Sequence, residues 1–272
     1  MQILTVVAPV FGTNCYVVVA DDGTCVVVDA GAGVAGPVRD AVTGRGLRCV
    51  AVLATHGHVD HTWDAAELSE AFDVPVYVHA ADAYRLDDPF GTLGLGASHD
   101  PGGPLAQALT AAGARPESYR RPERVETFGG AAGEGGRSAD VVLALGGVRV
   151  VARHAPGHTQ GSTLYLLGAA PEAVDGAPAA RAGNAGTARA AAGAGGAGSA
   201  AAGGGDLVAL TGDVLFAGTI GRTDLPGGDG AVMAATLRDV VAALPPHTVV
   251  LPGHGPSSRV ATELVGNPYL AR

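Results

Sequence analysis

One short loop constrains this chain more than any other stretch. Residues 55–61 read Thr-His-Gly-His-Val-Asp-His and place four side chains that can bind a metal within six positions. A strand-like apolar run, 49–54, precedes the loop, and a helical pattern, 62–72, follows it. Imidazole and carboxylate groups are the ligands that zinc prefers in catalytic sites, where one coordination position stays open for water. The loop therefore predicts one part of a metal site and requires further ligands elsewhere.

Three later side chains of the same ligand types also follow apolar runs. They are His158, Asp213 and His254, and we expect them to meet the first loop at one edge of the sheets. Seven groups are too many for one tetrahedral ion, but they suit two ions that share Asp213 and leave room for a common hydroxide. The candidate ligands are His56, His58, Asp60, His61, His158, Asp213 and His254.

Short Val-rich runs alternate with helical patterns along the chain. Residues 3–7, 15–20 and 24–29 predict an antiparallel opening. From residue 24 to residue 86, strand-like and helical segments alternate, which indicates an α/β layered fold. Further strands are expected at 74–78, 141–145, 148–152, 163–167, 206–210 and 248–251. One further helix is expected to end near residue 45, another to span 231–244, and a third to follow residue 257.

The length of 272 residues fits one domain, 1–272, with a substantial core. Residues 168–205 are almost wholly Ala and Gly and have too little apolar bulk to offset the entropy lost on ordering. This stretch is predicted to be a disordered, low-complexity insertion between two strands. Residues 87–139 are rich in Gly and Pro, and we expect them to wrap the surface, with a short helix near 104–113 and a candidate substrate lid.

Charge and composition limit the classes of partner that this chain is expected to bind. The formal net charge is −9, and every basic residue is Arg. Binding of phosphates requires clustered positive charge, so a nucleic-acid or anionic-membrane surface is not expected. The N-terminal sequence lacks the pattern of a signal peptide, and no apolar run reaches the ~20 residues of a membrane helix, so we expect a cytoplasmic protein. Cys15, Cys25 and Cys49 lie in apolar runs without CxxC spacing and are expected to be buried reduced thiols.

A glycine motif at 31–36 raises a different possibility. It fits the G-x-G-x-x-G pattern of dinucleotide-binding loops and follows a strand-like run. The acidic residue expected about 20 positions later is missing, because Thr55 and His56 stand there. With 43 glycines in the chain, such a pattern arises easily by chance. We therefore interpret 31–36 as a glycine-rich turn between a strand and a helix.

As a set, the motifs resemble those of metallo-β-lactamase-fold hydrolases. The set comprises H-x-H-x-D-H at 56–61, Pro-Gly-His-Thr-x-Gly-Ser at 156–162, Gly212-Asp213 and Gly253-His254, in that family's order. The resemblance implies an αββα sandwich of two mixed sheets flanked by helices. It also implies two metal ions, with Asp29 holding the histidine loop in place. By this resemblance the first ion is bound by His56, His58 and His158, the second by Asp60, His61 and His254, and Asp213 bridges the two.

Within that family, residues 212–229 and 267–269 resemble the small glyoxalase II-like hydrolases, which cleave thioesters such as S-lactoylglutathione. The resemblance implies attack of a metal-bound hydroxide on the thioester carbonyl, with Asp60 and Asp213 as catalytic residues and Asp60 orienting the hydroxide. Two divalent ions are the expected cofactors. Zinc is favoured, and iron or manganese are alternatives.

The substrate is less well defined than the chemistry. The longer glyoxalase II enzymes carry a C-terminal helical domain with basic contacts to glutathione, whereas this chain ends soon after His254 and has no Lys. The expected partner is thus a small-molecule thioester whose thiol is left open, as is the oligomeric state. Candidate substrate contacts are Tyr84, Arg85 and Arg222.

Other functions remain as alternatives. An iron-dependent persulfide dioxygenase resembles this subgroup and also has a Gly-Arg-Thr-Asp segment, but the Leu-Pro-Gly-Gly-Asp continuation at 225–229 favours the hydrolase. A phosphodiesterase is disfavoured by the acidic charge, a β-lactamase by the lack of an export signal, and a scaffold protein by the intact ligand set. His79, His154 and His247 are expected to be structural or surface histidines.

Overall fold

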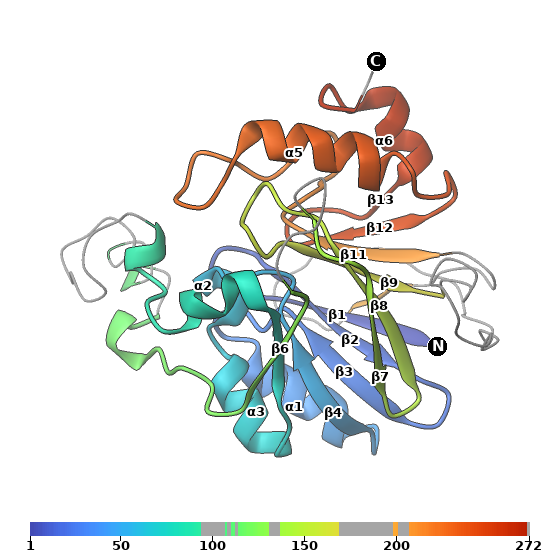
Figure 1. Cartoon of the computed structure of the whole chain (residues 1–272). Coiled ribbons are helices and arrows are strands. Elements are labelled where there is room, and N and C mark those ends of the chain that lie inside the picture. The colour runs from blue at the N-terminus through green and yellow to red at the C-terminus, as the bar shows by residue number, and fades with distance from the viewer. Residues whose placement is uncertain are drawn as a thin grey trace.

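Two β-sheets pack face to face, and helices cover the outer face of each (Figure 1). This computed structural model describes residues 1–93, 107, 110–111, 114–130, 137–168, 198–200 and 207–270. In Figure 1, α1 (Ala35–Thr43) and α3 (Ala65–Phe72) lie below the first sheet, and α5 (Gly230–Thr236) and α6 (Val260–Gly266) lie above the second. The αββα order predicted from the sequence is confirmed.

The first sheet contains seven strands in the order β10-β1-β2-β3-β4-β5-β6. The first three strands along the chain pair antiparallel, and the pairs from β3 to β6 are parallel. Parallel pairing brings the carboxyl ends of these strands to one edge, where the histidine loop leaves β4. The strands are β1 (Gln2–Val7), β2 (Asn14–Val19), β3 (Thr24–Val28), β4 (Arg48–Leu53), β5 (Val76–His79), β6 (Val125–Phe128) and β10 (Gly198–Ala200).

The second sheet contains six strands in the order β13-β12-β11-β9-β8-β7. All neighbouring pairs are antiparallel except β11 with β12, which is parallel. This parallel pair sends the chain out of both strands at the same edge, and each strand is followed by a predicted ligand. The strands are β7 (Val141–Leu145), β8 (Val148–His154), β9 (Thr163–Leu167), β11 (Val208–Gly212), β12 (Val249–Pro252) and β13 (Ser258–Arg259).

Shorter helical segments connect these elements. α2 (Val59–Thr62) follows the histidine loop, and a π-helical turn (Leu237–Val241) extends α5. The 3₁₀ segments are η1 (Ala80–Leu86), η2 (Gly91–Leu93) and η3 (Pro116–Ser118). Among the described residues, none of these helices has the length and apolar character that crossing a bilayer requires.

The Val-rich strands supply two cores at once, because successive side chains of a strand point to opposite faces. In β3, Val26 and Val28 pack into the core between the two sheets, whereas Cys25 and Val27 pack toward α1 and α3. Burial on both faces explains why these strands are continuous apolar runs. The expectation for the cysteines is confirmed, since all three are buried free thiols.

The structure differs from the sequence expectations at several elements. The predicted helix over 62–72 starts earlier, at Val59, and is divided into α2 and α3. Strand β6 lies in the stretch that was expected only to wrap the surface, because its residues pair with β5. Strand β10 lies in the insertion predicted to be disordered, where three residues pair with β1. The remainder of that insertion, and most of the helix expected near 104–113, fall outside the described residues.

Candidate metal centre

The loop after β4 meets three segments of the second sheet. Two of its histidines lie in the loop itself, and the next two ligands lie on α2. The second sheet contributes one residue from the β8–β9 connection, one directly after β11 and one after β12. The seven predicted ligands fall into three groups whose ligand atoms lie within 4.8 Å of one another: His56-His58-His158, His56-His61-Asp213 and Asp60-His61-His254.

The first set consists of three buried imidazoles. His58 Nδ1 lies 3.1 Å from His56 Nε2 and 2.9 Å from His158 Nε2. On the far side of its ring, His158 Nδ1 lies 2.7 Å from the carbonyl oxygen of Arg222, to which it donates. This hydrogen bond fixes the tautomer, so Nε2 of His158 presents a lone pair to the cluster.

The second set mixes imidazole and carboxylate. His61 Nε2 lies 3.3 Å from His254 Nε2 and 3.6 Å from Asp60 Oδ2. Asp60 Oδ2 and His254 Nε2 are 3.3 Å apart. Three ligand atoms thus face a common point from α2 and from the loop after β12.

Asp213 lies between the two sets. One carboxylate oxygen, Oδ1, is 3.3 Å from His61 Nε2. The other, Oδ2, is 3.6 Å from His158 Nε2 and 3.7 Å from His254 Nε2. The Asp213 carboxylate therefore lies within reach of ligands from both sets, and a carboxylate in that position can bind two ions at once.

The electrostatics of the two sets differ. Burial lowers the pKa of His56 well below its ordinary value, and burial with the nearby His158 lowers the pKa of His58 to about 3. These rings are therefore neutral at neutral pH, which is the form that binds metals. Burial also acts to lower the pKa of His61, but Asp213 and Asp60 outweigh it and raise that pKa well above its ordinary value. The second set is thus a place where negative charge attracts a cation.

The donor chemistry of the first set fits a metal ion. The lone pair of His158 Nε2 and the ring nitrogen Nε2 of His56 both approach His58 Nδ1. A single proton on His58 Nδ1 can satisfy only one of these two neighbours. A divalent cation accepts all three lone pairs at once, so the described residues fit one ion here and a second beside Asp60, His61 and His254.

Other buried groups hold the ligand loops. Asp29 accepts hydrogen bonds from the backbone N–H and hydroxyl of Thr55, at 2.8 and 2.9 Å. Asn14 donates to the carbonyls of Pro252 and Gly255 on either side of His254, and the Tyr16 hydroxyl also donates to Pro252. Asn14 was not predicted from the sequence. A polar residue at the start of a strand that is otherwise apolar was the signal for it.

A pocket of about 410 Å³ is open to the ligands. Of the predicted substrate contacts, only Arg222 lines it, and its guanidinium is held by Asp224 at 2.7 Å. Arg85 is fully buried, and Tyr84 donates to the side chain of Gln160, so neither lines this pocket. Its walls are formed by five of the ligands together with Phe11, Val59, Leu93, Phe216, Gly221, Arg222 and Leu225.

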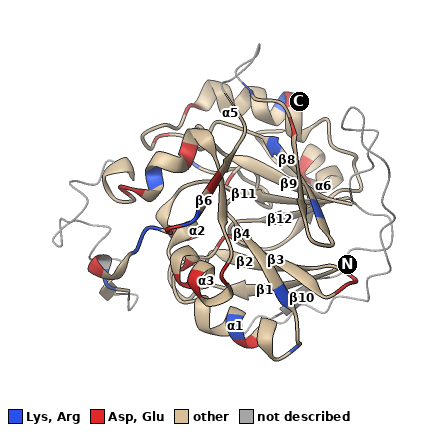
Figure 2. Cartoon of the chain, turned by 60° about the horizontal axis from the view of Figure 1, so that its bottom comes forward, with Lys and Arg blue, Asp and Glu red and all other residues tan. Residues whose placement is uncertain are grey.

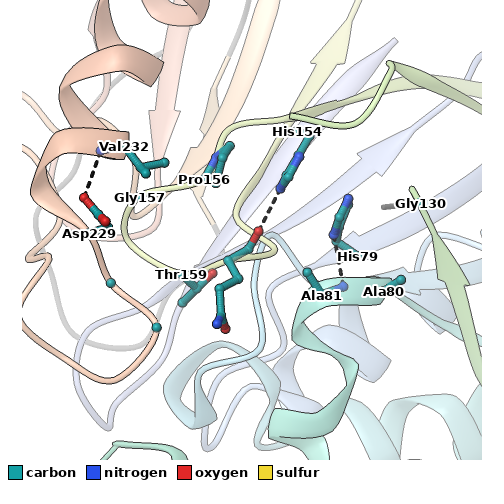
Figure 3. A pocket seen from close by; sticks show the side chains of 13 residues that line it. His79, Ala80, Ala81, Gly130, His154, Pro156, Gly157, Thr159, Asp229 and Val232 are labelled. Atoms are coloured by element: carbon teal, nitrogen blue, oxygen red, sulfur yellow. Dashed lines mark hydrogen bonds between the residues drawn. The ribbon is translucent and has the colours of Figure 1, made fainter. Parts of the chain in front are cut away.

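A larger cavity of about 640 Å³ contains none of the predicted ligands. His79 and His154 stack in its wall, with ring centroids 4.1 Å apart and planes 11° apart (Figure 3). His79 Nδ1 accepts from the N–H of Ala81, and His154 Nε2 lies 2.7 Å from the carbonyl of Gln160. Both rings are buried and bonded to the protein, as expected for structural histidines.

Comparison with other proteins agrees with this geometry. Residues 8–170 match the model of the metallo-beta-lactamase superfamily. An uncharacterized protein of Mycobacterium tuberculosis is 35% identical over 264 residues, which cover 97% of this chain and 95% of the relative. The probable metallo-hydrolase YqgX of Bacillus subtilis is 30% identical over 257 residues, 94% of this chain and 92% of the relative. The hydroxyacylglutathione hydrolase GloC of Haemophilus influenzae is 24% identical over 274 residues, 99% and 98% of the two chains.

Solved structures show the same architecture. The BLEG-1 B3 metallo-beta-lactamase superimposes with a TM-score of 0.65 at 25% identity, covering 99% of this chain and 100% of that chain. The protein TTHA1623, solved in a di-iron-bound form, superimposes with a TM-score of 0.61 at 26% identity, covering 95% and 96%. With its two ligand sets, its αββα layers and these similarities, this chain belongs to the metallo-beta-lactamase superfamily.

Proposed function

We propose that this protein hydrolyses a thioester of a small thiol with the help of two divalent metal ions. The observation that carries the proposal is the pair of ligand sets that share Asp213 and border one pocket. The thioester is supported by the similarity to GloC, which extends over 99% of this chain and 98% of the relative. The metal chemistry and the substrate class are thus supported by separate observations.

Divalent ions, when bound, lower the pKa of water to about 7 and polarise a carbonyl group. Asp60 lines the pocket, and its Oδ2 lies 3.3 Å from His254 Nε2, so its carboxylate is placed to orient the attacking water. The water oxygen forms a bond to the carbonyl carbon, its protons pass to solvent, and the C–S bond breaks. The products are a carboxylate and a thiolate. Because a thiol has a pKa of about 8.5, its thiolate leaves without a dedicated acid.

The pocket walls favour a partly apolar substrate. Phe11, Leu93, Phe216 and Leu225 provide the apolar surface, and Arg222 is the basic group in the lining. We propose that the acyl or thiol chain packs against the apolar wall and that Arg222 contacts a polar end of the substrate. Replacement of Arg222 by Ala should then raise KM more than it lowers kcat, because the guanidinium is not among the groups that bind metal.

We propose zinc as the ion in both sets, with iron or manganese as alternatives, because imidazole and carboxylate ligands suit all three. The distribution of charge supports a small-molecule partner over a nucleic acid. In Figure 2, basic and acidic positions are interspersed over the described elements, without a basic stripe along any element in that view. Binding of a phosphate backbone would require such a stripe.

A steady-state assay on the purified, metal-loaded protein tests the proposal. S-lactoyl and S-acyl conjugates of several cellular thiols serve as substrates, and thiol release is measured. We expect hydrolysis that is lost in His58→Ala and Asp213→Ala and retained in Asp239→Ala. Asp239 is a suitable control because it is exposed and pairs with Arg238 on the outer helix.

Two results would overturn the proposal. The first is one iron per chain together with oxygen uptake on a persulfide, which is the behaviour of a dioxygenase. The second is full thioesterase activity in His58→Ala or Asp213→Ala, which would make these residues structural. A β-lactam in the same assay shows whether ring opening competes with thioester cleavage.

A further inference from the structure

The carboxylate of Asp82, in η1, accepts four hydrogen bonds in the interior. Its side chain is 0% exposed. Oδ2 accepts from the backbone N–H of Gly57 at 2.9 Å and from the hydroxyl of Thr159 at 2.6 Å. Oδ1 accepts from the backbone N–H of Gly161 at 2.8 Å and from Arg85 Nε at 3.2 Å. Both carboxylate oxygens are therefore fully engaged with protein donors.

Three of these donors belong to the two loops that supply the first metal set, and the fourth, Arg85, lies in η1 itself. Gly57 stands between His56 and His58, and Thr159 follows His158 directly. The first loop leaves the first sheet after β4, whereas the second loop connects β8 and β9 of the second sheet. One carboxylate thus joins loops from different sheets within a few residues of three ligands.

The close contact between Asp82 and the two loops requires glycine at positions 57 and 161. A Cβ at Gly57 would lie 2.8 Å from the carbonyl oxygen of Asp82 and 2.9 Å from the side chain of Arg85. A Cβ at Gly161 would lie 2.7 Å from Cβ and Cγ of Asp82. Since real Cβ atoms do not approach so closely, any side chain at either position would push Asp82 away from the loops.

Arg85 balances the charge of Asp82 in the interior. Its side chain is also 0% exposed, and its guanidinium donates to the carbonyl of Pro226 at 2.9 Å and to the carbonyl of Thr92 at 3.3 Å. A buried carboxylate without a partner would be strongly destabilising, so the pair has to be retained as a unit. Through Arg85, this unit also supports the segment before the glycines at 227–228, next to Leu225 in the pocket wall.

We propose that Asp82 is the positioning residue of the first metal set, which fixes His56 and His58 relative to His158. It acts through the backbone of the two loops and does not contact the ions. Polar groups behind metal ligands typically change metal affinity about 10- to 100-fold when removed. The four hydrogen bonds described for the Asp82 carboxylate reach Gly57, Thr159, Gly161 and Arg85 rather than the ligands of the second set, so the second set should be independent of Asp82.

Metal titration of the full chain in two backgrounds tests this inference. In His254→Ala only the first set is complete, and in His158→Ala only the second set is complete. Asp82→Asn keeps the shape of the side chain but replaces one acceptor oxygen with a donor group. We expect Asp82→Asn to raise the zinc Kd about 10- to 100-fold in the His254→Ala background and to leave it unchanged in the His158→Ala background.

Glu263→Gln is the matched control. Glu263 is likewise buried and accepts from Gly218 N–H and Asn267 in the C-terminal helix. The Glu263→Gln substitution should lower the melting temperature of the metal-free protein without changing the zinc Kd in either background. Equal zinc affinity with and without Asp82→Asn, or an equal loss in both backgrounds, would overturn the inference.

A milder variant keeps the test decisive where Asp82→Asn fails to fold. Thr159→Val removes one donor to Asp82 and preserves side-chain volume, and Thr159→Ser retains the hydroxyl. We expect Thr159→Val to weaken zinc binding in the His254→Ala background and Thr159→Ser to restore it. Identical zinc affinity in the two Thr159 variants would contradict the inference. Since zinc affinity is measured without substrate, these results are independent of whether the protein is a thioesterase.

Discussion

The carboxylate of Asp29 lies 3.0 Å from Nδ1 of His61, on the side of the ring opposite the nitrogen that faces the second metal set. The same carboxylate accepts two hydrogen bonds from Thr55, at the start of the histidine loop. Asp29 has a positive φ of 59°, a conformation that Asp and Asn tolerate better than other residues with a side chain. Asp29 therefore holds a negative charge behind His61 from a backbone geometry that few replacements can adopt.

Asp29→Asn should retain that backbone and lose the negative charge behind His61. We expect the second zinc ion to bind about 10- to 100-fold more weakly, because a carboxylate behind a ligating imidazole raises its basicity. Stepwise zinc titration against a chelator measures this. Asp73→Asn is the control, since Asp73 also has a positive φ, of 53°, but its side chain is 94% exposed. Unchanged binding of both ions by Asp29→Asn would refute the prediction.

Removal of metal should destabilise the fold. Without ions, the ligand atoms of His56, His58 and His158 are held within 4.8 Å of one another in the interior with no cation to satisfy them. Zinc at about 100 times its Kd should stabilise the protein by about 2.7 kcal/mol per site and raise its melting temperature by about 5 to 10 °C. Differential scanning fluorimetry of chelated and zinc-loaded protein measures this shift. Asp213→Ala should show a smaller rise, and an equal rise would contradict the role of Asp213 in both sets.

The two sheets are joined by a hydrogen bond close to the histidine loop. The Tyr165 hydroxyl, on β9, donates to the carbonyl of Ala54 at 2.8 Å, and its side chain is 0% exposed. Tyr165→Phe leaves that carbonyl without this donor and should lower the free energy of unfolding by about 1 to 2 kcal/mol. Urea denaturation monitored by circular dichroism tests this. Tyr269→Phe, at a side chain that is 58% exposed, should leave stability unchanged.

The stacked pair of His79 and His154 should make stability depend on pH. Burial lowers the pKa of His79 from 6.5 to about 4. Between these values the unfolded chain binds a proton that the folded chain does not, so the free energy of unfolding falls as the pH is lowered from 6.5 toward 4. His79→Phe keeps a ring beside His154 and cannot titrate, so its stability should fall less steeply over this window. Urea denaturation at several pH values, in the presence of a chelator, measures how the free energy of unfolding changes with pH in the unsubstituted protein and in His79→Phe. The same pH dependence in both proteins would refute the prediction.

Much of the site was predictable because its ligands lie close after strands in the sequence. His56, His58, Asp60 and His61 stand within six positions, and each later ligand follows an apolar run. In a layered fold the ends of neighbouring strands lie at one edge of a sheet. Side chains that directly follow the strands could therefore be expected to lie close together. The structure places all seven predicted ligands in overlapping groups. The pairing of specific atoms, such as His158 Nδ1 with the Arg222 carbonyl, depends on the loop conformations and was not predictable.

The supporting residues were less accessible to sequence reasoning. Asp82 lies in a short 3₁₀ segment and reaches Gly57 and Gly161, which are 25 and 79 positions away. Arg85 was expected to contact the substrate, yet it is buried beside Asp82. A single sequence shows residue types but not the long-range partners that compensate a buried charge. Strand β6 was missed for a related reason, since its exposed polar residues are held by pairing with β5.

The two sheets are built largely from successive halves of the chain, β1 to β6 and then β7 to β13, with β10 as the exception. Neither half carries a complete set of ligands, because His158 and His254 come from the second half and their partners from the first. Metal binding is therefore a property of the assembled pair of sheets. Two separately expressed fragments, each forming one sheet, would bind zinc tightly only after complementation, so metal uptake would report directly on reassembly of the sandwich.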